Sequence, residues 1–141
     1  TNSVRNALAL VRCPGFTVIL VGGILNKEEL SLGNDFSVML DGLHIDILFM
    51  SAGGIHPTVG LTDQGFGEAR VQNKMRQLSS RTVVLADSGK FGKASLVKIC
   101  SLQDVNTIIT DTSLDPTMEK AVRETGVELI MVPTEEKLNL H

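Results

Sequence analysis

Residues 83–93 have the sequence VVLADSGKFGK, which combines a predicted strand with a predicted binding turn. The apolar run up to Ala86 is β-branched or aliphatic and stops abruptly at Asp87, as is typical of a strand buried on both faces of a parallel sheet. Lys90 follows between Gly89 and Gly92, and glycine leaves a turn open to close approach. The stretch therefore predicts a buried strand whose carboxyl end carries a carboxylate and an ammonium group.

Similar apolar runs recur along the chain, and the segments between them have helical spacing. Alternation of strands with helices predicts right-handed crossovers and an α/β fold, with an open, mostly parallel sheet and helices on both faces. The absence of repeats, low-complexity tracts and linkers predicts a single domain over residues 1–141. Strands are expected over residues 16–23, 45–54, 81–89, 106–111 and 126–132, and helices over 3–12, 36–43, 67–80 and 115–126.

The helix boundaries and apolar faces can also be predicted. Asp115 and Pro116 are expected at the N-cap and first helical position of the last helix, and Gly126 at its stop. The first helix places Val4, Ala7, Leu8 and Val11 on one face, which is expected to be buried.

Composition excludes several classes of function. With 43% hydrophobic residues, 21% charged residues and a net charge of −3, the chain has the balance of a globular domain without a basic nucleic-acid-binding surface. No segment approaches the length of a membrane span, so no membrane partner is expected. Cys13 and Cys100 lie in apolar contexts without metal-ligand spacing, which favours a reducing, cytoplasmic location and predicts no metal or cofactor.

Glycine-containing turns follow three of the predicted strands, at residues 21–23, 51–54 and 86–90. Ligands of open α/β sheets bind beyond the carboxyl ends of the strands, where glycine exposes backbone N–H groups to anions. Each turn alone is more often structural than functional. Together with Lys90 they predict a crevice for a small anionic ligand, such as a phosphorylated metabolite.

Individual polar residues leave alternatives open. Asp87 is either a general base or, more commonly, a residue that shapes the turn. Lys90 can bind a phosphate, form a Schiff base or lie in solvent, and anion binding is favoured slightly. Glu68 begins a helix, where the macrodipole alone favours a carboxylate, although it can also face the pocket. His56 can line the crevice, and Asp111 is expected to cap a turn.

The ordered motifs resemble the C-terminal effector-sensing domain of DeoR-family bacterial transcriptional repressors. The most specific part is residues 87–92, with the pattern Asp-Ser-x-Lys-Phe-Gly, followed by Ile-Thr-Asp at 109–111. The resemblance covers nearly the whole chain in the same order. Its motifs are TNS (1–3), LVGG (20–23), SLG (31–33), IDILFMSAGGIHPTVGLTDQGFGEARVQNKM (45–75), VVLADSGKFGK (83–93) and VNTIITD (105–111).

This resemblance implies a fold related to ribose-5-phosphate isomerase, glucosamine-6-phosphate deaminase and CoA transferases. It implies a sensor of phosphorylated sugars or related intermediates that controls operator binding by an N-terminal helix-turn-helix domain, in a homo-oligomer. The ligand-binding residues assigned from the motifs and the resemblance together are Asn2, Ser3, Gly22, Gly23, Ser51, Gly53, Gly54, Glu68, Asp87 and Lys90.

The sequence departs from the family pattern in two respects. The DNA-binding domain, and the first strand with its phosphate loop, are expected before TNS and are absent from these 141 residues, so a sheet edge is expected to be exposed. In the isomerase relatives two acidic residues end the strand equivalent to residues 45–54, where this chain has Met50 and Gly53. Neither can accept a proton, which favours binding without turnover.

Two other functions remain open at this point. An isomerase or deaminase would need Glu68 or Asp87 as its base, and a structural dimerisation module would have no pocket. Effector specificity is expected to lie in loops at residues 24–34 and 55–66.

Overall fold

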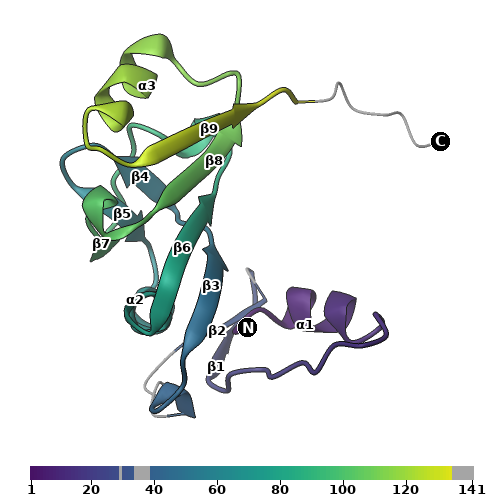
Figure 1. Cartoon of the computed structure of the whole chain (residues 1–141). Helices are drawn as coiled ribbons and strands as arrows, with labels where there is room; N and C mark the ends of the chain where they lie inside the picture. Colours follow the sequence, from purple (N-terminus) through teal and green to yellow (C-terminus); the bar gives the residue numbers. More distant parts are fainter. Residues whose placement is uncertain (29, 34–38, 135–141) are drawn as a thin grey trace.

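The computed structural model describes residues 1–28, 30–33 and 39–134, and from residue 60 onward its strands alternate with α-helices or 3-10 helices (Figure 1). The predicted fold class, an α/β fold with an open, mostly parallel sheet, is confirmed. The elements are α1 (Val4–Leu10), β1 (Ile24–Asn26), β2 (Ser31–Gly33), β3 (Ile45–Met50), β4 (Gly54–His56), β5 (Gly60–Asp63), α2 (Phe66–Gln77), β6 (Ser79–Leu85), the 3-10 helix η2 (Ser88–Lys90), β7 (Val97–Cys100), the 3-10 helix η3 (Leu102–Asp104), β8 (Thr107–Asp111), α3 (Pro116–Arg123) and β9 (Glu128–Val132).

The main sheet is parallel and has the strand order β3-β6-β8-β9. It contains four of the five strands predicted from apolar runs. Its register aligns Met50, Val84, Ile108 and Leu129 across the four strands, and all four side chains are buried. Residues in register point to the same face of a sheet, so this row forms a continuous apolar surface.

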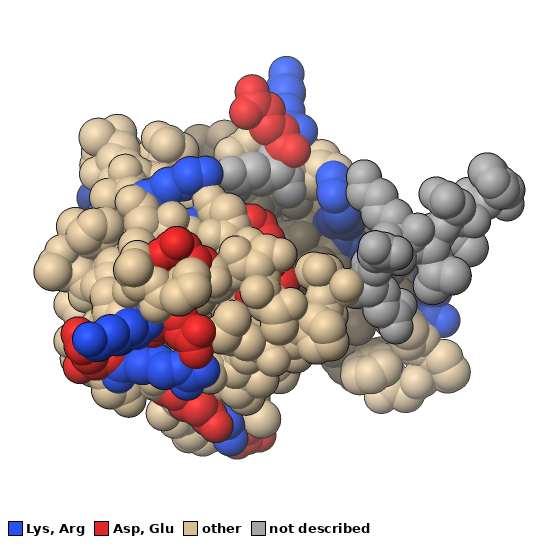
Figure 2. Space-filling model, turned by 90° about the horizontal axis from the view of Figure 1, so that it is seen from above, with Lys and Arg blue, Asp and Glu red and all other residues tan. Residues whose placement is uncertain are grey.

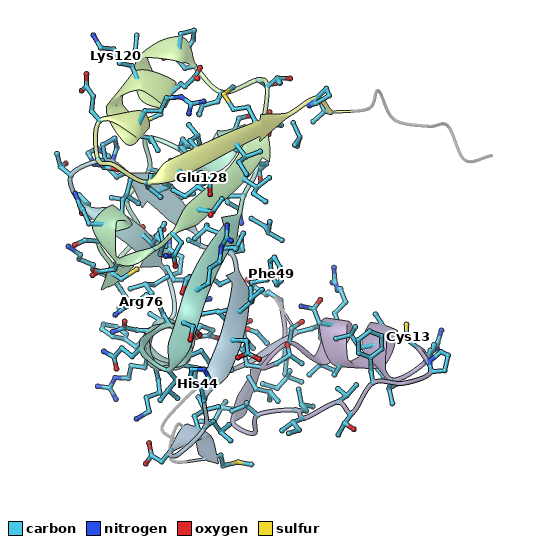
Figure 3. All side chains as sticks on the ribbon, in the orientation of Figure 1. Cys13, His44, Phe49, Arg76, Lys120 and Glu128 are labelled. Atoms are coloured by element: carbon cyan, nitrogen blue, oxygen red, sulfur yellow. The ribbon has the colours of Figure 1, made fainter. Side chains whose placement is uncertain are left out.

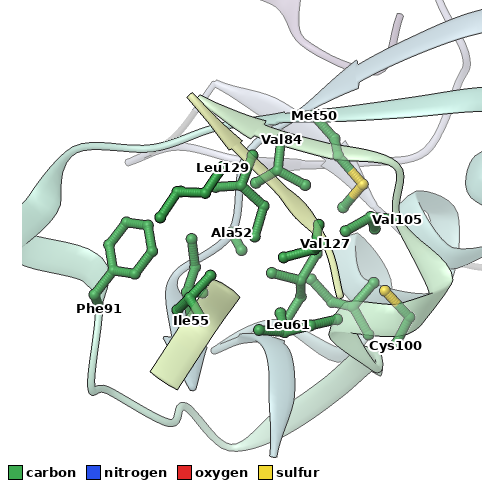
Figure 4. Close-up of a cluster of buried hydrophobic side chains, with 14 of the residues drawn as sticks. Met50, Ala52, Ile55, Leu61, Val84, Phe91, Cys100, Val105, Val127 and Leu129 are labelled. Atoms are coloured by element: carbon green, nitrogen blue, oxygen red, sulfur yellow. The ribbon is translucent and has the colours of Figure 1, made fainter. Parts of the chain in front are cut away.

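The hydrophobic core lies between this row and a second, three-stranded antiparallel sheet with the order β4-β5-β7. Ile55 and Leu61 of the smaller sheet are fully buried against the row, and Phe91 closes one side of the cluster (Figure 4). Val122 of α3 joins the same cluster, whereas α2 contributes Val71 and Met75 to an adjoining one. Burial of side chains of this size contributes roughly 1.5–3 kcal/mol each.

The opposite face of the parallel sheet is partly open in the described part of the chain. Phe49 is 62% exposed, and Ile47, Leu85 and Val132 on the same face are also exposed. Figure 3 shows Phe49 on β3, on the side of the sheet where α1 and the segment before β1 lie. β3 hydrogen-bonds only to β6 among the described strands, so its other edge is free.

The prediction of a strand over residues 16–23 is wrong. This segment is extended, but its backbone pairs with a single residue: the Thr1 amino group donates to Ile19 O at 2.9 Å, and Val21 N donates to Thr1 O at 2.8 Å. A strand forms only where a neighbour supplies a ladder of hydrogen bonds, and one residue is too short for this. Phe16 and Ile19 remain exposed as a result.

The first helix forms where it is predicted, but its apolar face is not buried. Ser3 is the N-cap of α1, with its Oγ accepting from Asn6 N at 3.2 Å. No residue of α1 is buried, and Leu8 and Val11 are exposed in the described structure. The helix is therefore specified by local capping while its hydrophobic face lacks a described partner.

The later helices agree with the predictions. α2 and α3 match the segments expected at 67–80 and 115–126. Asp115 is the N-cap of α3 and accepts from Thr117 N at 2.9 Å and Met118 N at 3.2 Å, with Pro116 at the first turn. Gly126 has φ = +88°, as a helix stop requires.

The structure tests the remaining predictions of secondary structure only in part. Of the helix predicted over 36–43, residues 36–38 lie outside the described residues, and the described part contains a short 3-10 turn at Met39 and Leu40. The segments 24–34 and 55–66, expected as loops, instead contain the antiparallel pairs β1–β2 and β4–β5. Strands of three or four residues with glycine in them are too short to show a periodic pattern.

The two cysteines have opposite environments. Cys100 is buried, and burial raises the pKa of its thiol to about 11. Cys13 is exposed near the tip of the N-terminal segment, so its expected apolar environment is wrong (Figure 3). None of the described helices is long and apolar enough to cross a bilayer.

Adjacent glycines after β3 allow a matched test of how tightly the start of β4 packs against β5 and the loop that contains Lys93. A β-carbon at Gly54 would lie 2.6 Å from Lys93 O and 2.8 Å from Thr62 Oγ1, whereas one at Gly53 would meet Ser95 Oγ at 3.3 Å. We expect Gly54→Ala to lower the free energy of unfolding by about 1–3 kcal/mol, and Gly53→Ala by less than about 1 kcal/mol. Urea denaturation measures both, and equal losses would contradict this packing.

Candidate functional site

The carboxyl ends of β3 and β6 converge at one edge of the parallel sheet. Ser51 directly follows β3, and the turn η2 containing Lys90 follows β6. Because these strands are parallel neighbours, their ends lie side by side. Lys90 Nζ donates to Ser51 Oγ at 2.9 Å and joins the two ends. Two of the three predicted turns, at residues 51–54 and 86–90, thus meet at this edge with the Lys90 ammonium group, whereas the turn at 21–23 does not line the cavity there.

A cavity of about 510 Å³ opens at this junction, and we call it the Lys90 cavity. Its size falls within the range of small-molecule sites. Two cationic and two carboxylate side chains contribute to its wall, with hydroxyl and amide groups between them. The lining residues are Ser3, Arg5, Glu28, Ser51, Ala52, Gly53, Asp63, Gln72 and Lys90.

Backbone hydrogen bonds hold the Lys90 turn in place. Asp111, at the end of β8, accepts from Ser88 N at 2.7 Å through Oδ2 and from Ser113 N at 3.0 Å through Oδ1. These N–H groups, led by that of Ser88, lower the pKa of the Asp111 carboxyl to about 2. Further along, Gly92 N donates to Ile55 O at 2.9 Å. Asp111 thus acts as a cap, as predicted, and fixes the start of the turn that carries Lys90.

The floor of the cavity is a buried carboxylate on the smaller sheet. Asp63 ends β5 and is 5% exposed. Its Oδ1 accepts from Gln64 N at 2.7 Å, and its Oδ2 accepts from Gln72 Nε2 on α2 at 3.3 Å. Gly53 lies directly above, since a β-carbon there would be 3.4 Å from Asp63 Oδ1.

The N-terminal segment supplies the remaining wall. Leu32 N donates to Asn2 O at 2.7 Å and Val4 N donates to Leu30 O at 2.8 Å, so the β1–β2 pair holds the start of α1. This contact places Ser3 and Arg5 at the cavity, opposite the smaller sheet. Arg5 adds a second cation to the site.

Four of the ten predicted ligand-binding residues line the cavity: Ser3, Ser51, Gly53 and Lys90. The other predicted residues have local structural contacts. Asn2 Nδ2 donates to Leu32 O at 3.1 Å. Gly22 lies beside Met39, and Gly23 approaches Gly33 so closely that a β-carbon would lie 2.6 Å from Gly33 O.

Gly54, Glu68 and Asp87 also lie outside the cavity lining. Gly54 packs under the backbone of Lys93. Glu68 is buried in the first turn of α2, and its carboxylate folds back against Gly65 at the N-cap. Asp87 is exposed at the start of η2.

Sequence reasoning missed Arg5, Glu28, Asp63 and Gln72. Asp63 had a recognisable signal, because it ends an apolar run as Asp87 and Asp111 do. The short hairpin that carries it was expected to be a loop. His56, considered for the crevice, lies instead in the β4–β5 turn, where its Nδ1 accepts from Thr58 N at 3.3 Å.

The two acidic residues of the isomerase relatives are replaced by Met50 and Gly53, as the sequence indicates, but the cavity contains another carboxylate. Met50 is buried in the core, and Gly53 lines the cavity without a side chain. Glu68 and Asp87, the carboxylates that an enzyme was expected to use, do not line the cavity, whereas Asp63 and Glu28 do.

A second, more apolar groove of about 820 Å³ runs along the free edge of β3. We call it the β3-edge groove. Ile19 and Val21 line one side, and Ile47 and Phe49 of β3 line the other. It shares Ser3, Ser51 and Gln72 with the Lys90 cavity, so the two hollows adjoin each other.

Charges on the surface are mixed. Figure 2 shows acidic and basic side chains interleaved on the face in view, without one broad basic patch. Within the described ranges, no three His, Cys, Asp or Glu side chains come together as metal ligands.

Residues 1–112, which contain the whole Lys90 cavity, match the family model of the DeoR C terminal sensor domain. The chain belongs to this family. It is 34% identical to an HTH-type transcriptional regulator of Bacillus subtilis, over 94% of the chain and 52% of the relative. It is 31% identical to the L-fucose operon activator of Haemophilus influenzae, over 93% and 53%.

An HTH-type transcriptional repressor of Bacillus subtilis, GlcR, is 29% identical over 96% of the chain and 53% of its own length. The chain thus spans about half the length of the curated relatives it matches. All three of these relatives carry names of transcriptional regulators.

The Asp111 cap generates a prediction about pH. The pKa of this carboxyl falls from 3.8 to about 2 on folding, so the carboxylate stabilises the folded chain above pH 3.8. That contribution is lost as the pH falls through about 2. Asp111→Asn is therefore expected to lower Tm at pH 6, with the difference from the parent shrinking toward pH 2. A difference that stays constant across this range, measured by circular dichroism, would contradict the cap.

Proposed function

We propose that this chain is a sensor domain that binds a phosphorylated sugar, or a related metabolite, in the Lys90 cavity. The observation that carries the proposal is the Lys90 ammonium group, held at the carboxyl ends of β3 and β6 by Ser51. Arg5, which lines the same cavity, supports it, because two cations can share a phosphate dianion. The name of the L-fucose operon activator supports a sugar-related effector.

We propose that binding is not followed by turnover, and that the sensor controls a helix-turn-helix domain N-terminal to this segment, in a cytoplasmic homo-oligomer. A ligand need only favour one arrangement of subunits by roughly 1–3 kcal/mol to change operator occupancy several-fold. Such a shift moves paired DNA-binding domains relative to their half-sites, whose spacing is fixed by the DNA helix.

The β3-edge groove supports the expectation of a further strand and phosphate loop preceding Thr1. Both sides of this groove have backbone suited to pairing: β3 has a free edge, and Thr1 bonds with Ile19 and Val21 in the parallel pattern. We propose that a preceding strand of the same polypeptide occupies the groove. Because groove and cavity share Ser51, its loop would then face Lys90.

An alternative function is a sugar-phosphate isomerase or deaminase. The observation that favours it is Asp63, a carboxylate in the cavity next to the position of the lost acidic pair. Incubation of the full-length protein with ribose 5-phosphate and glucosamine 6-phosphate separates the two functions. Turnover abolished by Asp63→Asn would establish the enzyme, and intact substrates support the sensor.

The sensor function predicts a specific loss in Lys90→Ala. We expect at least one of ribose 5-phosphate, glucosamine 6-phosphate, glucose 6-phosphate and fructose 6-phosphate to raise the Tm of the full-length protein. It is also expected to change the protein's affinity for operator DNA. Loss of a charge-assisted contact should weaken binding by about tenfold or more.

Lys93→Ala is the matched control, because Lys93 is exposed on the same loop and outside the cavity lining. It should bind like the parent. The proposal fails if none of the four compounds binds, or if Lys90→Ala and Lys93→Ala behave alike.

A further inference from the structure

We infer that Asp63 and Gln72 form a hydroxyl-recognition end of the Lys90 cavity, and that the ligand is a polyhydroxylated phosphate bound with neighbouring hydroxyl groups against these two side chains. This inference rests on the proposed function and specifies its ligand. The anion is held at one end by Lys90 and Arg5, while the other end selects for hydrogen-bond donors.

The first observation is a buried acid with spare acceptor capacity. Asp63 is 5% exposed, yet no ion pair joins it to a cation in the described part of the chain. Its carboxylate can accept about four hydrogen bonds. Gln64 N and Gln72 Nε2 supply two of them. Each oxygen therefore has one partner and capacity for another, and a ligand in the cavity can bring the further donors.

The second observation is the orientation of Gln72. Its Nε2 donates to Asp63 Oδ2, which fixes which way the amide is turned. Its Oε1 is buried and has no hydrogen-bond partner among the described residues. Buried polar atoms without partners are uncommon, so this oxygen is a second acceptor awaiting a donor. Asp63 and Gln72 together therefore form an acceptor pair in the cavity wall.

The third observation is the access that Gly53 leaves to this pair. A β-carbon at Gly53 would lie 3.4 Å from Asp63 Oδ1, so any side chain there would cover the carboxylate. In the isomerase relatives this position is expected to be acidic. The absence of a side chain at Gly53 leaves the Asp63 carboxylate uncovered on this side.

The chemistry of the two ends determines the ligand class. Inorganic phosphate or a simple carboxylate satisfies Lys90 and Arg5 but offers no hydroxyl donor to Asp63. A sugar or polyol phosphate carries both an anion and several hydroxyl groups, and a cavity of about 510 Å³ accommodates it. Hydroxyl donors to a buried carboxylate are strong, charge-assisted contacts.

The test compares Asp63→Asn with Asp46→Asn in the full-length protein. Asparagine at position 63 replaces one carboxylate oxygen with an NH₂ group. The Gln72 amide must then turn so that its Oε1 accepts from this NH₂ group. Neither that carboxylate oxygen nor Gln72 Oε1 is then left to accept from the ligand. Asp46 is an exposed residue that pairs with His44 at 3.5 Å, outside the cavity lining, and serves as the control. Calorimetric titrations use the four sugar phosphates named above and inorganic phosphate.

We expect Asp63→Asn to raise the Kd of the tightest-binding sugar phosphate about tenfold or more. The Kd of the same variant for inorganic phosphate should change less than about threefold. Lys90→Ala is expected to weaken the binding of both ligands, and Asp46→Asn is expected to weaken the binding of neither. If Asp63→Asn fails to fold, Gly53→Ala replaces it, because its added methyl group covers the carboxylate and should cause the same selective loss.

The outcomes separate this inference from the proposed function. If Lys90→Ala weakens the sugar phosphate and the variants at 63 and 53 do not, hydroxyl recognition at Asp63 is wrong and the sensor remains. If the sugar phosphates bind no more tightly than inorganic phosphate, the inference is also wrong. If none of these anions binds, the proposed function itself fails.

Discussion

The parallel pairing of β3 with β6 is the constraint on which the site depends. It aligns Met50 with Val84 in the buried row that crosses the sheet, and it ends both strands at the same edge. Only this register places Ser51 within hydrogen-bonding distance of Lys90, which lies far from it in sequence. A shift by one residue would turn the buried row outward, so the hydrophobic core also fixes the geometry of the cavity.

The smaller sheet gives the cavity its chemical asymmetry. Thr62 Oγ1 accepts from Ser95 N at 2.8 Å, and Gly92 N donates to Ile55 O, so the loop after β6 is fastened along the hairpin that ends at Asp63. Cationic groups therefore lie on the strand-end and α1 sides, and the buried carboxylate lies on the hairpin side. Strand β5 of the same hairpin also pairs with β7, with a β-bulge in the register, and this pairing holds the hairpin to the rest of the domain.

Long apolar runs made the parallel sheet predictable from sequence, because strands buried on both faces lack polar residues. The segment 16–23 has the same composition but failed as a strand, since composition cannot reveal whether a neighbour is present to pair with it. Lys90 and Ser51 could be predicted from turns at strand ends. Asp63 was missed because the short strand that it ends was expected to be a loop. Gln72 lies in the predicted helix α2, and helical spacing alone does not show that its polar side chain faces a cavity. Glu68 and Asp87 were attractive as carboxylates, yet Glu68 is buried in the first turn of α2 and Asp87 is exposed at the start of η2, and neither lines the cavity.

The central claim is that one cavity holds an anion at Lys90 and hydroxyl groups at Asp63. A crystal structure of the full-length protein with its tightest-binding sugar phosphate tests this most directly. The account predicts a phosphate oxygen within about 3 Å of Lys90 Nζ and ligand hydroxyl groups at a similar distance from the Asp63 carboxylate. The account would be contradicted by a ligand that is bound elsewhere, while the cavity holds no ligand and the Lys90–Ser51 hydrogen bond is intact.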